Sequence, residues 1–103
     1  MTLGKDESIR VVVLKEGDSF IAQCLEVDIC AAAQDIDELD TLLAMTLRAE
    51  FLNLGGTEDD PFPGVGPAPE YFQGLWDKCR FRSEPVEVPG IDHGTTYQMA
   101  VCA

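Results

Sequence analysis

The chain has 103 residues, of which 46% are hydrophobic, and its 19 acidic and 7 basic residues give a formal net charge of −12. This length corresponds to one compact domain, and the apolar content is well above that of disordered chains. The charge argues against direct DNA or RNA binding, because neutralising phosphates requires clustered Lys and Arg side chains.

The N-terminal residues 1–7 contain no apolar stretch behind a basic start, so the sequence predicts no secretory signal. No apolar run approaches the roughly 18 residues of a membrane-spanning helix. We therefore expect a cytoplasmic protein that does not associate with a membrane. Most of the acidic residues lie within residues 1–60, so a basic partner would prefer that part of the chain.

Three strands are predicted in the first third of the chain. Residues 8–14 are rich in β-branched side chains, and Gly17 then marks a turn. Residues 19–26 follow as an antiparallel partner strand. Residues 29–33 are short and apolar and stop at a strong helix-start signal, so they predict a third strand.

An amphipathic helix follows the third strand. Asp35 is placed to cap its first turn, and Glu38 completes a capping box three residues later. Apolar residues recur at three- and four-residue spacing, and they are Ile36, Leu39, Leu42, Leu43, Leu47, Phe51 and Leu54. Gly55-Gly56 predicts a left-handed C-cap. The early carboxylates are interpreted as partners of the helix dipole.

The second half of the chain predicts a loop, a short helix and a terminal hairpin. Residues 55–69 are rich in proline, and Phe62 and Val65 are expected to pack back on the core. Residues 70–79 predict a short helix opened by a proline. Alternation over residues 95–102 predicts a final strand.

These elements predict the α+β class: an antiparallel β-sheet with a β-β-β-α core, a C-terminal short helix and a β-hairpin extension. A single domain over residues 1–103 is expected. It would consist of the core at residues 8–54, the proline-rich loop at 55–69 and the extension at 70–103.

The first half of the chain resembles the N-terminal domain of HicB-like antitoxins. The likeness lies in the strand and turn of residues 11–18, in residues 20–29, and in the capped helix from Asp35, where Asp37-Glu38 occupy acidic positions of the first turn. The resemblance implies a partial ribonuclease H-like fold without the nuclease residues. Family members typically cover a small basic toxin that cleaves mRNA, and many form dimers or larger oligomers.

Two departures from the family pattern bear on function. Many members have a glycine where Ala33 stands here. Full antitoxins usually add a DNA-binding domain, whereas residues after 55 predict only the loop, short helix and hairpin. The one basic cluster, Lys78, Arg80 and Arg82, is too small for such a module. We therefore expect protein partners and homo-oligomers, with no direct nucleic-acid contact.

No catalytic, cofactor-binding or metal-binding residue is predicted. The four cysteines form no C-x-x-C pair, and His93 is interpreted as an exposed or capping turn residue. Cys24 and Cys30 are interpreted as small buried hydrophobic residues, and disulfides are not expected without export. A small carboxylate-based metal enzyme stays open as a minor alternative, and it would use Asp28, Asp35, Asp37 and Glu38.

Five residues are predicted to bind a partner: the acidic Glu26 and Asp28, and the aromatic Tyr71, Phe72 and Trp76. Aromatic side chains dominate interface hot spots, although these three could instead cap the core. The favoured function is an antitoxin-type module that binds a basic protein. The main alternative is a stand-alone oligomeric scaffold or inhibitor of the phage or mobile-element type, with no toxin partner.

Overall fold

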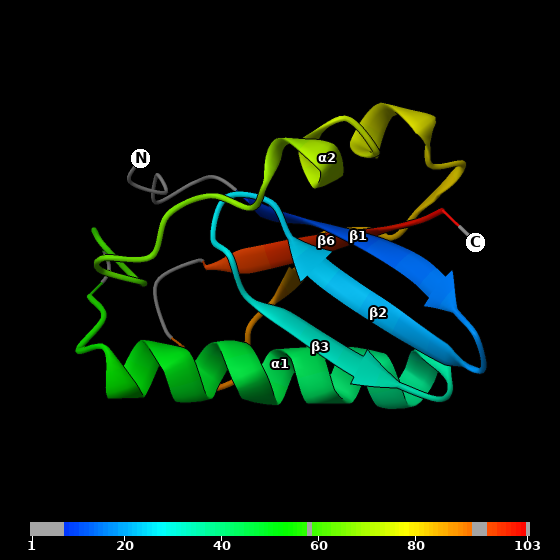
Figure 1. Ribbon diagram of the computed structural model, residues 1–103. Coiled ribbons are helices and arrows are strands. Elements are labelled where there is room, and N and C mark those ends of the chain that lie inside the picture. Colours follow the sequence, from blue (N-terminus) through cyan, green and yellow to red (C-terminus); the bar gives the residue numbers. More distant parts are fainter. Residues whose placement is uncertain (1–7, 58, 92–94, 103) are drawn as a thin grey trace.

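The computed structural model describes residues 8–57, 59–91 and 95–102 (Figure 1), so the interpretations of His93 and of residues 1–7 lie outside the described part. The elements in chain order are β1 (Ser8–Glu16), β2 (Ser19–Cys24), β3 (Cys30–Ala33), α1 (Ile36–Asn53), α2 (Glu70–Gln73), the 3-10 turn η1 (Trp76–Lys78), β4 (Phe81–Arg82), β5 (Val86–Glu87) and β6 (Thr96–Val101). None of the described helices is long and apolar enough to cross a membrane.

The strands form one mixed sheet in the order β3-β2-β1-β6-β4, with β5 also paired to β6. Neighbouring strands are antiparallel except β1 and β6, which run parallel, with Ile9 opposite Tyr97 and Val13 opposite Val101. The α+β class and the β-β-β-α order are confirmed, whereas the prediction of an antiparallel sheet is wrong. The hairpin partner β2 occupies one side of β1, and the long crossover through α1 brings β6 to the other side in parallel.

One face of the sheet packs on α1, which lies beneath it in Figure 1. Leu39, Leu43 and Leu47 of α1 are fully buried, and they join a cluster that includes Val11 and Val13 of β1. The three leucines recur at the four-residue spacing that defines one helix face. The apolar residues that recur at helical spacing in the sequence are therefore the ones with which α1 covers this face of the sheet.

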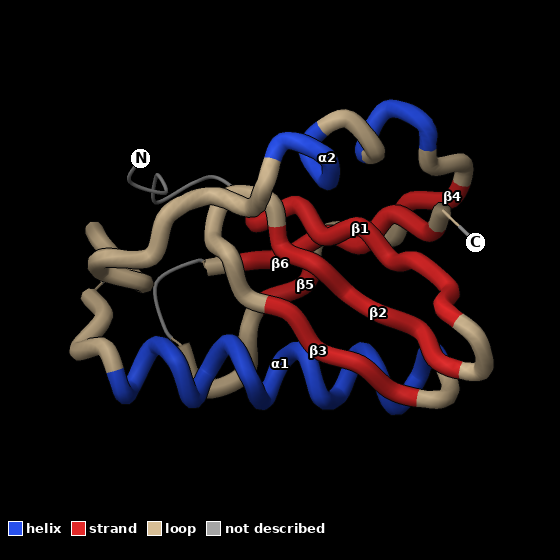
Figure 2. Tube along the Cα trace, in the orientation of Figure 1, coloured by secondary structure: helices blue, strands red, loops and turns tan. Residues whose placement is uncertain are grey.

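The opposite face is covered by the segment that contains α2 and η1, so the protein has three layers (Figure 2). Val12 of β1 and Ala100 of β6 point into this second cluster with Trp76 and Cys79. Alternate residues of a strand point to opposite faces. The run Val11-Val12-Val13 is fully buried because both faces of β1 are covered.

The ends of α1 follow the capping signals of the sequence. Asp35 caps the first turn, its carboxylate accepting a hydrogen bond of 2.7 Å from the backbone N–H of Glu38. At the other end, Gly55 adopts a φ of 69°, and the N–H of Gly56 donates to the carbonyl of Phe51 at 2.8 Å. This is the Schellman arrangement, and it requires a residue that tolerates positive φ. Both predicted ends of the helix are confirmed.

The C-terminal half differs from its prediction in two details. The helix expected over residues 70–79 breaks at Gly74 into α2 and η1. The hairpin extension is an interrupted edge strand, because both β4 and β5 pair antiparallel with β6. The packing of the proline-rich loop is confirmed, since Phe62 is buried in the α1-side cluster and Val65 packs against it.

Replacing a buried leucine of α1 tests whether this helix covers the sheet. Leu43→Ala should lower the free energy of unfolding by about 3 kcal/mol, because it leaves a cavity in the core. Leu52→Ala is the matched control: its side chain is 61% exposed, so a change within about 0.5 kcal/mol is expected. Urea unfolding followed by circular dichroism gives both values. Equal losses for the two variants would contradict the packing of α1 described above.

Candidate partner-binding surfaces

Glu26, one of the predicted partner-binding residues, is engaged within the chain. Its carboxylate accepts hydrogen bonds from the backbone N–H and from Nε of Arg10, both at 2.6 Å, and its side chain is only 13% exposed. Charge-assisted bonds to two donors are among the stronger polar contacts in proteins. Glu26 therefore holds the segment after β2 against β1, and little of its carboxylate remains available to a partner.

Asp28 lies two residues further on and is exposed. One carboxylate oxygen accepts a hydrogen bond of 3.0 Å from the side-chain amide of the buried Gln23. Its backbone N–H donates to the carbonyl of Gly66 at 2.8 Å, which fixes the loop beside it. Asp28 is thus an oriented and accessible carboxylate.

Trp76, predicted as an aromatic anchor for a partner, belongs to the core. Its side chain is in the second cluster, and the residue is 9% exposed. The guanidinium groups of Arg82 and Arg10 lie 4.7 and 5.8 Å from the centre of its ring. Cation–π contacts of this kind stabilise the cover of the sheet. Arg82, a member of the predicted basic cluster, is used for this purpose.

Tyr71 is the exposed member of the aromatic group, with 69% of its surface accessible. Its ring meets that of Phe72 edge-to-face at 5.2 Å, and Phe72 packs down on the second cluster. In the same layer, the side-chain amide of Gln73 donates to the carbonyl of Leu25 at 2.7 Å. The structure therefore brings α2 close to the segment of Glu26, and it separates Tyr71 from the buried Trp76.

One end of the molecule gathers exposed acidic residues, a feature that the partner-binding predictions missed. The turn between β1 and β2 lies there beside the start of α1, because Phe20 pairs with Ala33 just before the helix cap (Figure 1). We call this surface the acidic end, and its members are Glu16, Asp18, Asp35, Asp37 and Glu38. The basic residue next to them is Lys15, whose amine lies 5.9 Å from the ring centre of Phe20.

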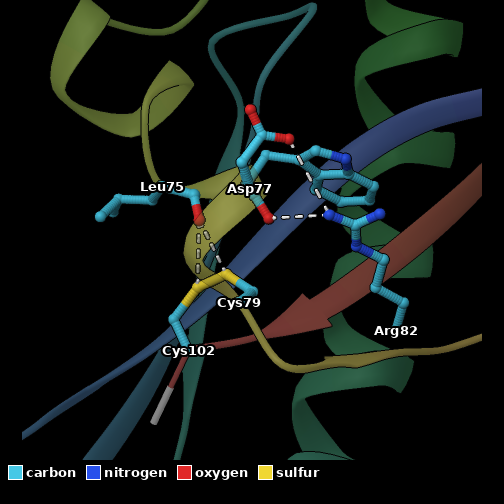
Figure 3. The surroundings of a disulfide bond; sticks show 6 residues. Leu75, Asp77, Cys79, Arg82 and Cys102 are labelled. Atoms are coloured by element: carbon cyan, nitrogen blue, oxygen red, sulfur yellow. Dashed lines mark hydrogen bonds and ion pairs between the residues drawn. A yellow bond between two sulfur atoms is a disulfide. The ribbon is translucent and has the colours of Figure 1, made fainter.

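A disulfide joins Cys79, just after η1, to Cys102, just after β6 (Figure 3). The two Cα atoms are 4.4 Å apart although the residues are 23 positions apart in the sequence. Both sulfur atoms pack beside the carbonyl oxygen of Leu75, at 3.2 and 3.7 Å. The expectation that the chain has no disulfide is therefore wrong, because the fold brings two distant segments together.

The two free cysteines are Cys24 and Cys30. Cys24 is fully buried as predicted, and burial, together with the nearby Glu26 and Cys30, raises the pKa of its thiol. Such a thiol is a poor nucleophile at neutral pH. Cys30 is exposed at the start of β3, so the prediction that it is buried is wrong. The described residues contain no group of three or more His, Cys, Asp and Glu side chains placed to hold a metal ion.

Comparisons with protein-family models, with curated proteins and with solved structures found no match to this chain. The resemblance to HicB-like antitoxins therefore depends on the residues and elements described above.

Removing the disulfide tests its contribution to stability. Cys102→Ser should lower the free energy of unfolding by about 3 kcal/mol, because the bond closes a loop in the unfolded chain between residues 23 positions apart. Cys30→Ser is the control, since Cys30 is exposed and unpaired. Thermal unfolding is measured with and without a reductant. A melting temperature for the unmodified chain that does not change on reduction would contradict a stabilising disulfide.

Proposed function

We propose that the chain is a HicB-like, antitoxin-type module that acts by binding a basic protein partner and has no catalytic activity of its own. It would be cytoplasmic, would bind no nucleic acid directly and would form homo-oligomers. The proposal combines the charge of the surface with the order of the elements.

The observation that carries the proposal is the acidic end. Its five carboxylates lie on two adjoining segments, one formed by the end of β1 and the turn after it and the other by the N-cap and first turn of α1, and all belong to exposed residues. Clustered charge of one sign raises the rate of encounter with a partner of the opposite sign and disfavours partners of like sign. A chain of net charge −12 that presents this surface is suited to a basic partner.

The fold supports the family part of the proposal. Three antiparallel strands are followed by α1, and the chain then returns as β6 parallel to β1. This arrangement is compatible with the partial ribonuclease H-like fold that the resemblance implies. Of the three residues in the predicted basic cluster, Arg82 is occupied by Trp76 and Asp77, which leaves less positive surface for nucleic acid.

The disulfide bears on the cytoplasmic part of the proposal. Disulfides persist mainly in oxidising compartments and are rare in the cytosol. A cytoplasmic chain should therefore carry Cys79 and Cys102 as free thiols in the cell, and alkylation of thiols at the moment of lysis would show this state.

The alternative, an oligomeric scaffold or inhibitor without a toxin, is favoured by one observation. β3 is the outermost strand on one side of the described sheet, and its residues Cys30–Ala33 carry neither charge nor proline. Such an edge can pair with a strand of another chain. Because both candidate functions include homo-oligomers, the alternative is tested by capture from a lysate, in which a scaffold of this kind recovers only copies of itself.

Capture of partners from a native lysate tests the proposal. The tagged chain is expected to recover a small basic protein in near-equal amount at low salt. High salt should reduce the recovery, because it screens exposed charges. Bound proteins are identified by mass spectrometry.

Two charge-matched double variants make the capture experiment specific. Asp18→Asn with Asp37→Asn removes two charges from the acidic end and should reduce the recovery several-fold. Asp59→Asn with Asp60→Asn removes two charges from the loop after α1, at the opposite end of the molecule, and should leave recovery unchanged (Figure 1). Recovery of only the chain itself would contradict the proposal and favour the scaffold.

A further inference from the structure

A groove lies between α1 and the edge strand β5, on the α1 side of the sheet. It has a volume of about 360 Å³, and α1 contributes Asp40, Met45 and Arg48 to its walls, while Val86 and Tyr97 come from β5 and β6. The groove exists because α1 packs chiefly on β3 and β2 at the other side of the sheet. The helix therefore leaves the β6–β5 side of that face partly uncovered.

The walls of the groove include exposed apolar side chains. Met45 is 61% exposed and Val86 is 46% exposed. Val86 pairs with Tyr97, so it points to the same face of the sheet as the buried Tyr97. A second hollow continues along α1 past Met45 and is lined by Ala49 and the exposed Leu52. Contiguous apolar surface beside a groove is typical of an interaction site.

A carboxylate is held at the wall of this groove. The hydroxyl of Tyr97 donates a hydrogen bond of 2.6 Å to Oδ1 of Asp40, and Tyr97 itself is only 3% exposed. Burial and the contact with Asp40 raise the pKa of Tyr97, so its hydroxyl stays protonated and continues to donate at neutral pH. Within the described residues, no other hydrogen bond and no ion pair involves the Asp40 carboxylate, so Oδ2 can accept from a ligand.

Charge selects the kind of occupant. Asp40 follows Asp37 by one turn of α1, so the groove continues the acidic end along the helix, and Glu87 adds a second acidic residue to its lining. Arg48 is the basic residue of the lining, and its side chain packs over Gly90, which has a φ of 82°. A second copy of the chain, also at −12, would bring like charges to this rim.

We propose that this groove is the docking site of the basic partner: it receives an apolar side chain of a cationic segment against Met45 and Val86, while Asp40 pairs with a neighbouring Lys or Arg of that segment. This inference depends on the proposed function. It adds which surface of the chain binds the partner and what kind of partner segment binds there. An amphipathic helix with apolar residues at three- and four-residue spacing fits a groove that runs beside α1.

The test uses a dye-labelled 15-residue peptide of leucine and lysine, with the leucines along one helix face, and follows its fluorescence anisotropy at low salt. The unmodified chain should bind this peptide and should not bind the same peptide with glutamate in place of lysine. Asp40→Asn should weaken binding about tenfold, because it keeps the oxygen that accepts from Tyr97 and removes only the charge. Met45→Ala should weaken it similarly by removing the apolar wall.

Two controls separate the groove from net charge and from the other exposed surface. Asp59→Asn removes one charge from the loop after α1, at the end of the molecule opposite the acidic end. Tyr71→Ala removes an exposed ring from the layer that covers the other face of the sheet. Both variants should therefore bind the peptide within about twofold of the unmodified chain. Equal weakening by Asp40→Asn and Asp59→Asn, a larger effect of Tyr71→Ala, or no binding of the lysine peptide would each overturn the groove proposal. Capture of a basic protein that Asp40→Asn and Met45→Ala leave unchanged would overturn the groove while sustaining the proposed function.

Discussion

The parallel pairing of β6 with β1 is the contact on which the rest of the structure depends. It places β1 at the interior of the sheet, bonded on both sides, and its residues Val11-Val12-Val13 are fully buried. A strand with a continuous apolar run such as this one is typical of a sheet whose two faces are both covered. The crossover between β3 and β6 supplies the two covers, α1 on one face and the segment with α2 and η1 on the other. The central position of β1, its burial and the two covering layers are thus all connected with this one pairing.

The same pairing accounts for the surfaces that the function is proposed to use. β5 pairs with β6 at one edge of the sheet, whereas α1 packs chiefly near the other edge, on β3 and β2. The groove therefore opens between α1 and β5. It also brings Cys102 beside Cys79, so the disulfide ties the cover of the second face to the end of β6. Tyr97 lies on β6 and orients Asp40 of α1. The two layers are thereby linked by one hydrogen bond at the wall of the groove.

Local features of the fold could be predicted from the sequence, and contacts between distant segments could not. The capping of α1 by Asp35 and its end at Gly55 depend on neighbouring residues, so both were predicted correctly. The direction of β6 was not predictable, because alternation along Tyr97 and Met99 is the same for either direction. The burial of Trp76 depends on where the chain folds back across the sheet. The break at Gly74 had a local signal, because glycine weakens a helix, but the prediction of one helix over residues 70–79 did not use it.

The candidate surfaces show the same limit. Net charge indicated a basic partner, but the acidic end arises only because the turn at Asp18 and the start of α1 meet in space. Glu26 has the charge expected of a site for a basic partner, yet its carboxylate is already paired with Arg10, which lies 16 positions earlier. The groove joins α1 to β5 across the crossover, so no sequence motif could mark Asp40 and Val86 as neighbours.

The most direct test of the structure is a nuclear Overhauser measurement of contacts between the backbone protons of β1 and β6 in the isotopically labelled protein. The parallel register predicts contacts of Ile9 with Tyr97 and of Val13 with Val101. Contacts of Ile9 with Val101 and of Val13 with Tyr97 would show an antiparallel pair. That result would contradict the crossover, the two-sided burial of β1 and the groove that the partner is proposed to enter.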